Sequence, residues 1–517
     1  MKPNQHTAPG KRAASAKHPV PSAAPKPRGF WRQFRTFAFG REQRPERLIP
    51  ILTGVLAFIL LIVCYPLPNT MSDSMGYVEF AARNAFTFFR PTGYAQFLRF
   101  AAFFSSAVQN VMIVQMLFYI LATAFILLVL RYYFPVRRTW LRLALDLGIT
   151  LHPAALYMTF TLMSDVLFCL LIYLMLTFLI IYAHERNLVS FLGFLLAFWA
   201  LLYVRYSAMF FPLAIVPMLL VLRGRVKWLL LLPVALILAQ FHHNISRNME
   251  DIYGKRQFST GFDGWQLLNN AIHALPYIET DSLRFDELEM QNLHLFLSLR
   301  KEQITEATRG GTEATASLMW QKDYPLKQYL GYRQTLKIDK DKSYGYLWIE
   351  LAGLYRRYGT YLILHYPGAF IKHYLWPNVK QIFLPSHYDI MGPYREVAIA
   401  NTYLPAWFGL PAGLVLHARH DFFPKITPVL TLYECLTWLL WLGAAVMLLL
   451  KKKQLQIPAG TAWTLWLLVC FAFVYYATTA FASPVVLRYW LPMNMCKWAF
   501  VWIVCHLLEN KKEIPQP

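Results

Sequence analysis

Four charged side chains of this chain lie where an apolar stretch begins or ends. Asp73 follows the first long apolar stretch in "NTMSDSMGYVEF", and Asp165 opens a later one in "TLMSDVLF". Arg205 separates two apolar stretches in "LLYVRYSAMFFP", and Arg488 precedes the last one in "SPVVLRYWLP". Arginine can bind phosphate through two parallel hydrogen bonds, and a carboxylate can accept a proton from an attacking hydroxyl. If the four side chains meet, they suit a reaction on a phosphate-bearing substrate.

Each of these residues also has a purely structural interpretation. A Ser-Asp pair in front of an apolar helix is a good N-cap, so Asp73 and Asp165 could simply bind free backbone amides. Arg205 and Arg488 could reach lipid phosphates, as arginines at a membrane interface often do. An Asp or Arg within hydrocarbon costs about 2.5–3.5 kcal/mol, however, so such residues usually face a cavity and a partner. All four fall on one face of the predicted topology, which favours a shared function.

The elements that must position these residues are membrane-spanning helices. The chain has 517 residues, of which 57% are hydrophobic and 16% aromatic. Apolar stretches close to the roughly 20 residues that cross a bilayer recur along it. We therefore expect an all-α polytopic membrane protein with about ten transmembrane helices, near residues 49–65, 110–130, 141–160, 165–183, 188–204, 206–222, 228–241, 426–450, 461–482 and 489–508.

The net charge of +22 indicates topology more than a nucleic-acid partner. Residues 1–48 carry eleven Lys or Arg against two Glu, among many Pro and Ala, and are predicted to be a disordered basic tail. Ten spans put this tail, Arg131, Arg137, Arg138 and the lysines at 451–453 on one side. Positively charged loops stay cytoplasmic, so we expect a multi-pass plasma (inner) membrane protein with cytoplasmic termini that contacts anionic membrane lipids.

Two segments are predicted on the extracytoplasmic side. In the first loop, 66–109, Tyr77, Phe80 and Ala81 share a helical face, as in helices that lie in the membrane interface. Glu79 and Arg83 are four residues apart and are expected to pair.

The second segment, 242–425, contains eighteen of the 28 acidic residues and twenty basic ones, which is typical of a folded, α-rich extracytoplasmic domain. It contains no cysteine and so needs no disulfide. The expected organisation is a tail at 1–48, an N-terminal transmembrane module at 49–241, the domain at 242–425, transmembrane helices at 426–510 and a cytoplasmic tail at 511–517.

Taken in order, these motifs resemble those of the GT-C-type integral-membrane glycosyltransferases, which include protein O-mannosyltransferases and lipid A aminoarabinose transferases. That family has an acidic residue early in the first external loop, then an aromatic and small residues, as at Asp73, Tyr77 and Ala81. It has Pro and then an acidic residue at the start of the fourth helix, as in "HPAALYMTFTLMSD". An Arg before an apolar stretch ending in Pro, at 205–212, and a late "RYWLP", at 488–492, match two further motifs.

The resemblance implies a GT-C-like fold and an inverting transfer of a sugar from a polyprenyl-phosphate-linked donor to an acceptor hydroxyl on a lipid or glycan, at the extracytoplasmic face. The implied residues are, for catalysis, Asp73 as general base and Asp165; for the donor phosphate, Arg205, Arg488 and Tyr489; and for the acceptor, Tyr77, Glu79 and Arg90. The first loop reads "SDS", without the paired acidic motif of metal-dependent oligosaccharyltransferases, which favours a reaction with neither metal nor cofactor.

Other functions fit parts of the pattern. A transporter or flippase for lipid-linked glycans would also use arginine for phosphate, but it would place charges or broken helices near mid-membrane. Asp146 is the main residue of that kind, and we expect it to form a hydrogen bond between helices. A polysaccharide polymerase or ligase would leave the carboxylate after the first span unexplained. A structural scaffold predicts that Asp73 can be replaced without consequence.

Overall fold

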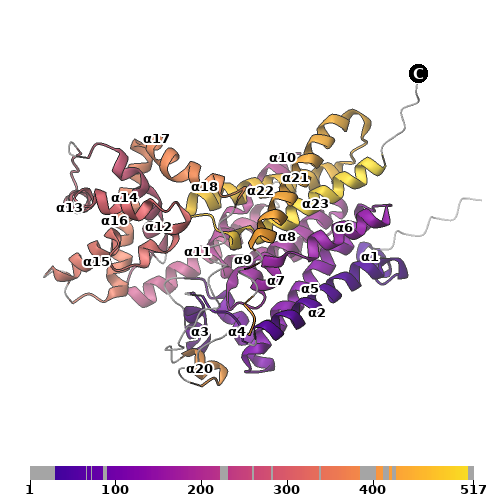
Figure 1. Ribbon diagram of the computed structural model, residues 1–517, viewed down its shortest axis with the longest axis horizontal. Helices are drawn as coiled ribbons and strands as arrows, with labels where there is room; N and C mark the ends of the chain where they lie inside the picture. The colour runs from indigo at the N-terminus through magenta and orange to yellow at the C-terminus, as the bar shows by residue number, and fades with distance from the viewer. Residues whose placement is uncertain are drawn as a thin grey trace, which may run out of the picture.

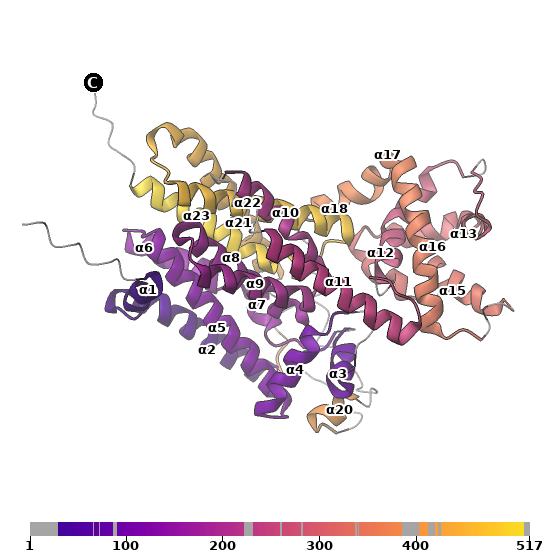
Figure 2. The same cartoon turned by 180° about the vertical axis from the view of Figure 1, so that it is seen from behind.

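The computed structural model describes residues 29–65, 67–71, 73–85, 90–221, 231–258, 261–280, 283–336, 339, 341–384, 403–411, 419–421, 425 and 427–510. In these ranges the regular elements are helices, and the β-type pairing is a single isolated bridge between Asn69 and Thr161. Figures 1 and 2 show a bundle of long helices with a separate helical lobe at one end. The protein is therefore all-α in its described part.

The bundle is built from helices that precede and follow the lobe in the sequence. Its elements are α2 (Arg44–Cys64), α5 (Val108–Tyr133), α6 (Thr139–Thr150), α7 (Pro153–Met158), α8 (Ser164–Glu185), α9 (Leu188–Val204), η2 (Tyr206–Phe210), α10 (Pro212–Val221), α11 (Leu231–Tyr253), α21 (Thr427–Lys451), η8 (Lys452–Gln454), α22 (Ala459–Ala482), η9 (Leu487–Trp490) and α23 (Leu491–Glu509). The closest helix pairs include α8 with α9, α5 with α8, and α21 with α23.

Six helices of the described residues are long and apolar enough to cross a membrane. They are Arg41–Cys64, Val108–Tyr133, Ser164–Glu185, Pro428–Gln454, Ala459–Ala482 and Leu487–Glu509, and two shorter apolar helices lie at Leu188–Val204 and Tyr206–Val216. The membrane-embedded character expected from the sequence is thus supported, whereas the count of ten spans stays a prediction.

Two of the expected spans have a different form. Residues 141–160 form α6 and α7, with a break at Leu151 and His152. The break has a local cause, because Pro153 lacks an N–H group and drives the preceding residue out of the helical region. His152 accordingly has φ −84° and ψ 107°. Residues 231–241 of the expected span at 228–241 form the first half of α11, and 228–230 lie outside the described residues. The helix continues to Tyr253, beyond the expected domain boundary at residue 242.

The centre of the bundle lies at α8 and α23. In the most apolar stretch of α8, 72% of the residues are buried inside the protein, and the share is 83% for Leu487–Glu509, against 22% for Arg41–Cys64 and 11% for Pro428–Gln454. The peripheral helices expose apolar side chains, such as Leu56 on α2 and Leu432 on α21. Exposed apolar surface of this extent is what lipid would cover.

The segment between α2 and α5 contains the short helices α3 (Ser74–Arg83) and α4 (Gly93–Phe104). A helix from much later in the chain, α20 (Tyr403–Phe408), packs against α3 (Figure 1). Beyond it, the hydroxyl of Tyr65 donates a hydrogen bond to Oδ1 of Asp421 at 2.7 Å. The end of the predicted 242–425 domain therefore lies beside the first loop rather than in the lobe.

The lobe comprises the helices between α11 and the segment that returns to the bundle. They are α12 (Phe262–Ala271), η4 (Ile272–Tyr277), α13 (Leu288–Ser298), α14 (Lys301–Thr308), η5 (Glu313–Trp320), α15 (Pro325–Thr335), α16 (Tyr344–His365), α17 (Pro367–Phe370), the π-helix η6 (Ile371–Leu375) and α18 (Trp376–Lys380). Its core is the crossing of α12 and α16, where a Cβ on Gly264 would lie 1.9 Å from the carbonyl oxygen of Ala352. Only glycine permits this approach, and the lobe agrees with the expected α-rich character of 242–425.

The expectation of disorder over residues 1–48 is wrong for residues 30–48. Here α1 (Phe30–Ala38) and η1 (Arg41–Gln43) lead into α2. Phe30 and Phe34 are buried, with their rings 5.6 Å from the ring of Tyr132 on α5. Aromatic residues four apart form a buried face, and this packing outweighs the basic composition of the segment. Residues 1–28 and 511–517 lie outside the described residues.

Candidate functional site

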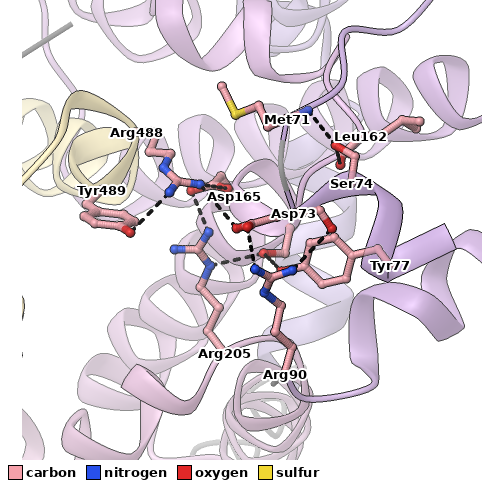
Figure 3. Close-up of polar contacts among 11 residues, drawn as sticks. Met71, Asp73, Ser74, Tyr77, Arg90, Leu162, Asp165, Arg205, Arg488 and Tyr489 are labelled. Atoms are coloured by element: carbon pink, nitrogen blue, oxygen red, sulfur yellow. Dashed lines mark hydrogen bonds and ion pairs between the residues drawn. The ribbon is translucent and has the colours of Figure 1, made fainter. Parts of the chain in front are cut away.

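The four charged residues singled out by the sequence meet at one end of the bundle (Figure 3). Asp73 directly precedes α3, and Asp165 lies in the first turn of α8. Arg205 directly follows α9, and Arg488 lies in η9, just before α23. Helix starts and helix ends meet here because neighbouring helices of the bundle run in opposite directions. Residues far apart in the sequence are thereby brought into one cluster.

Ion pairs connect the members of this cluster. Nη2 of Arg205 lies 2.7 Å from Oδ1 of Asp165. Nη1 of Arg488 lies between the two carboxylates, 3.7 Å from Oδ2 of Asp165 and 3.8 Å from Oδ2 of Asp73. Arg90, from the segment between α3 and α4, pairs closely with the carboxylate of Asp73 and donates from Nη1 to its backbone oxygen at 3.2 Å. We call Asp73, Asp165, Arg90, Arg205 and Arg488 the charged cluster.

The charged cluster has an excess of positive charge. Within these five residues, three guanidinium groups face two carboxylates, which leaves one positive charge when all five groups are ionised. The side chain of Asp165 is 1% exposed, whereas that of Asp73 is 24% exposed. The cluster therefore suits an anion, and Asp73 is the carboxylate that an incoming hydroxyl can reach.

The protonation state of Asp73 follows from two opposing effects. Burial raises the pKa of this carboxyl, because a charged group loses its hydration. The positive charges of Arg90, Arg488 and Arg205 outweigh burial and hold the pKa of Asp73 below its ordinary value. Asp73 is therefore ionised at neutral and mildly acidic pH, which is the state that a proton acceptor needs.

The N-cap interpretation is wrong for both aspartates. Asp73 occupies the N-cap position of α3, but its side chain makes no capping hydrogen bond, and its φ of −78° and ψ of −25° are helical. The carboxylate of Asp165 lies within the first turn of α8 and pairs with Arg205. Charge-assisted hydrogen bonds to guanidinium are about twice as strong as those between neutral groups, so the arginines bind these carboxylates in preference to backbone amides.

Backbone contacts fix the first loop against the start of α8. The backbone N–H of Asn69 donates to the oxygen of Phe160 at 2.7 Å, and the N–H of Leu162 donates back to the oxygen of Asn69 at 2.9 Å. The hydroxyl of Ser74 donates to the oxygen of Leu162 at 2.8 Å (Figure 3). Asp73 directly precedes Ser74, and Asp165 lies three residues after Leu162, so these contacts hold the two backbone segments that carry the carboxylates close together.

Tyr77 contacts Arg90 directly and Arg205 through Ser164. Its hydroxyl lies 2.9 Å from Oγ of Ser164, and that oxygen accepts a hydrogen bond from Nε of Arg205 at 3.2 Å. The guanidinium of Arg90 lies 5.1 Å from the centre of the Tyr77 ring. Tyr77 is only 3% exposed, so the structure places it beneath the cluster rather than at a surface that an acceptor would touch. Sequence reasoning missed Ser164, which it treated only as half of a Ser-Asp pair.

Tyr489 lies against two arginines. Its ring centre is 5.5 Å from the guanidinium carbon of Arg205 and 5.0 Å from that of Arg488. Nη2 of Arg488 also donates to the hydroxyl of Tyr489 at 3.4 Å. Contacts of this kind hold planar guanidinium groups in one orientation. Tyr489 therefore belongs to the site, next to the two arginines that the sequence assigned to phosphate.

Glu79 has a different surrounding from the one expected. It lies on α3, where its Oε1 is 3.4 Å from Nη2 of Arg83, and its side chain is 34% exposed. Arg83 in turn donates from Nε to the hydroxyl of Tyr403 on α20 at 2.8 Å. The predicted pairing of Glu79 with Arg83 is confirmed, and this pairing gives Glu79 a place outside the charged cluster.

A second ionic cluster is buried inside the bundle, and sequence reasoning missed it. Nζ of Lys497 on α23 lies 2.7 Å from Oε2 of Glu434 on α21 and 2.9 Å from Oγ1 of Thr437. Nε2 of His152, at the α6–α7 break, lies 3.3 Å from the other Glu434 oxygen. A single Glu and a single Lys within predicted spans were the available signal, because charges there rarely occur without a partner.

Asp146 does not form the expected hydrogen bond between helices. Its side chain is fully buried, and neither carboxylate oxygen has a hydrogen-bond partner in the described part of the chain. The nearby buried Glu46 pairs instead with Arg131 at 3.4 Å and with Arg142 at 3.6 Å.

Among the described residues, no group of three or more His, Cys, Asp or Glu side chains is arranged to hold a metal ion.

The chain was compared with protein families, curated proteins and solved structures. No family model matches the chain, and no match was found among curated proteins or solved structures. A function for this chain must therefore be inferred from its residues and their geometry.

Proposed function

We propose that this protein is a membrane glycosyltransferase of the GT-C type, which transfers a sugar from a polyprenyl-phosphate-linked donor to an acceptor hydroxyl on a lipid or glycan. The observation that carries the proposal is the charged cluster, in which Arg205 and Arg488 lie beside a reachable carboxylate, Asp73. The motifs that resemble the GT-C family are the ones that converge there.

The arginines are suited to hold the phosphate of the donor. Arg205 is oriented by Asp165 and by Oγ of Ser164. Arg488 lies 3.7–3.8 Å from the two carboxylates. Tyr489 contacts both guanidinium groups, so Arg205 and Arg488 would bind one phosphate together. The excess positive charge of the cluster favours the bound anion and the further negative charge that develops on it as the sugar leaves.

Asp73 would act as the general base. Its carboxylate takes the proton of the acceptor hydroxyl as that oxygen attacks the anomeric carbon. The bond between the anomeric carbon and the phosphate oxygen breaks, and its electron pair leaves with the polyprenyl phosphate. Attack opposite to the leaving group inverts the anomeric centre. The proton, the new bond and the leaving group are all accounted for in this step without a metal or cofactor.

The same arginines link the two halves of this reaction. Together with Arg90, which has the largest effect of the three, their charges hold the pKa of Asp73 below its ordinary value, which makes the carboxylate a weak base. When Arg205 and Arg488 bind a phosphate, its negative charge compensates theirs, and their effect on Asp73 decreases. Donor binding would thereby strengthen the base at the moment when an acceptor needs it.

The remaining residues have positioning roles in this proposal. Asp165 is buried and holds Arg205, while Arg90 holds Asp73. Tyr77 supports both arginines from beneath the cluster.

The site would face the extracytoplasmic side. Arg137 and Arg138 lie between α5 and α6, and the lysines at 451–453 lie at the end of α21 and in η8. The charged cluster lies at the start of α8, which packs against α5, and just before α23, which packs against α21. These are the opposite ends of the bundle, because each of these two helix pairs runs in the same direction. Because positively charged loops stay in the cytoplasm, both termini would lie inside and the cluster outside. The sugar would then be transferred at the outer surface of the plasma (inner) membrane.

One observation favours a second candidate function, a flippase for lipid-linked sugars. Glu434, Lys497 and His152 are charged or titratable groups inside the bundle, and His152 lies at a broken helix. Glu434 is the eighth residue of α21, about 10 Å from its start. If the chain is a flippase, Glu434→Gln should abolish transbilayer movement of a polyprenyl-linked sugar by the purified chain in liposomes. Absence of movement by the wild type rejects this candidate.

The transferase proposal is tested with Asp73→Asn in the native host. Asn keeps the size of the side chain and one oxygen that accepts hydrogen bonds, but it cannot take up the proton. At equal membrane levels, mass spectrometry should show the loss of one glycan modification and accumulation of its polyprenyl-linked donor. Asp251→Asn is the matched control, because Asp251 is 65% exposed on α11 and pairs with Arg247. Unchanged glycans in the Asp73 variant would refute the base assignment.

A further inference from the structure

A recess in the lobe is separate from both ionic clusters of the bundle. It has a volume of about 730 Å³ and is lined by Phe296, Leu299, Arg300, Gln303, Gln328 and Tyr332. These residues come from the end of α13, the turn at Leu299 and Arg300, the start of α14, and α15. Both views place α13 and α15 at the far side of the lobe from the bundle (Figures 1 and 2). The volume falls within the roughly 300–1,000 Å³ typical of sites for small molecules.

Arg300 is held rigidly by neutral groups. Its guanidinium carbon lies 3.5 Å from the centre of the Phe296 ring. Its Nε donates to Oε1 of Gln328 at 2.8 Å, and its Nη1 donates to the backbone oxygen of Phe296 at 3.0 Å. None of these three contacts carries a negative charge, so none of them compensates the guanidinium.

Other arginines of the lobe differ from Arg300 in this respect. Arg309 pairs with Glu306 at 2.8 Å, and Arg333 lies within 3.5 Å of Glu289 and 3.2 Å of Glu350. Arg356 and Arg357 are also in ion pairs with carboxylates. The arginine at the recess is thus fixed in position by contacts that leave its charge for a ligand.

The other lining groups offer hydrogen bonds of both kinds. Because Oε1 of Gln328 accepts from Arg300, the amide N–H groups of Gln328 are available as donors. Nε2 of Gln303 donates to the backbone oxygen of Asp323 at 2.6 Å, which leaves the carbonyl oxygen of Gln303 as an acceptor. The hydroxyl of Tyr332 can serve as either, and this side chain is 46% exposed.

Apolar surface completes the recess. The rings of Phe296 and Tyr332 lie 5.7 Å apart, centre to centre. Leu299, at the rim, is 85% exposed. An accessible aromatic side chain beside amides and a guanidinium matches a ring that has an apolar face and polar groups around its edge. Sugars have this form, and an uncompensated arginine favours one that carries an acidic group.

We propose that this recess binds an acidic sugar residue of a glycan, with the carboxylate on Arg300 and the sugar ring against Tyr332. Gln303 and Gln328 would bind the hydroxyls at the edge of the ring. This binding site does not depend on the transferase proposal, since it lies in the lobe and shares no residue with the charged cluster. If the chain is a transferase, the recess would hold a distant part of its glycan acceptor.

The test measures binding of trigalacturonate to the full chain in lipid nanodiscs by isothermal titration calorimetry, with maltotriose as the neutral probe. The wild type should bind trigalacturonate at least tenfold more tightly than maltotriose. Arg300→Gln should lower the affinity for trigalacturonate at least tenfold, and so should Tyr332→Ala. The matched control is Arg309→Gln, which removes an arginine that is 72% exposed and paired with Glu306. This control should leave the affinity unchanged.

Three results would overturn the proposal. The first is that the wild type does not bind trigalacturonate. The second is that Arg300→Gln and Tyr332→Ala both bind it as the wild type does. The third is that inorganic phosphate binds as tightly as trigalacturonate and Tyr332→Ala has no effect, which would show an anion site without a sugar. Tyr332 is half exposed, so its replacement keeps the test valid even if the Arg300 variant folds poorly.

Discussion

The buried pair of Asp165 and Arg205 makes an asymmetric prediction about stability. Arg205→Gln leaves the Asp165 carboxylate, which is 1% exposed, without the guanidinium 2.7 Å away, while Arg488 stays at 3.7 Å. Asp165→Asn leaves Arg205 instead, which is 20% exposed and can be hydrated. The arginine replacement should therefore lower the free energy of unfolding more than the aspartate replacement does.

The expected magnitudes follow from the burial of each group. Removal of one partner from a buried ion pair costs about 3–5 kcal/mol, and we expect about 3 kcal/mol for Arg205→Gln because Arg488 compensates part of the charge. For Asp165→Asn we expect about 1.5 kcal/mol, the low end for a charge-assisted hydrogen bond. The double variant should cost less than the sum by about 1–2 kcal/mol, because no buried charge is left without its partner.

The assay is SDS titration of the full chain in mixed detergent micelles, which gives the free energy of unfolding of each variant. The exposed pair of Arg247 and Asp251, 4.0 Å apart on α11, is the matched control. Its variants should change stability by less than about 0.5 kcal/mol. Equal costs for Arg205→Gln and Asp165→Asn, with simple additivity in the double variant, would refute the reasoning from burial.

Three further predictions follow from the same geometry. Arg90→Gln removes the positive charge closest to Asp73, so the pKa of that carboxyl should rise because burial is then less opposed. The base would protonate at higher pH, and the acidic limb of kcat against pH should move to higher pH. An unmoved limb would contradict the role of Arg90. Glu434→Gln leaves Lys497, which is 5% exposed, charged inside the bundle without its partner. The free energy of unfolding from the SDS titration should fall by about 3–5 kcal/mol, and adding Lys497→Met should restore more than half of that loss. A double variant as unstable as the single one would contradict the pairing. A Cβ at Gly93 would lie 2.4 Å from the backbone oxygen of Tyr203. Gly93→Ala should therefore lower the free energy of unfolding by about 1–3 kcal/mol, because it forces α4 away from α9. Wild-type stability of this variant would show that the two helices are not so close.

The sequence was most informative where one physical rule dominated. Apolar stretches of membrane-spanning length predicted an all-α membrane protein, and charges at their ends predicted which side chains meet. The structure joins these charges, Asp73, Asp165, Arg205 and Arg488, in ion pairs, as expected for charges at the ends of apolar helices.

The sequence was least informative where contacts between distant segments decide the outcome. In the sequence, both aspartates stand where an apolar helix begins, as N-cap residues do, but the arginines that bind their carboxylates come from other parts of the chain. The basic composition of residues 30–48 predicted disorder, yet Phe30 and Phe34 find an aromatic partner on α5. Lys497 and Glu434 are 63 residues apart, and no local pattern shows that they face each other.

The most direct test of the central claim separates phosphate binding from proton transfer. The measurement is the affinity of the purified full chain for polyprenyl phosphate, in the wild type and in three variants. Asp73→Asn should bind at least as tightly as the wild type, because it removes a negative charge from the cluster, yet it should not transfer sugar. Arg488→Gln should bind about tenfold or more weakly, and the exposed Arg247→Gln should bind normally. Equal affinities for Arg488→Gln and the wild type, or sugar transfer by Asp73→Asn, would contradict the account.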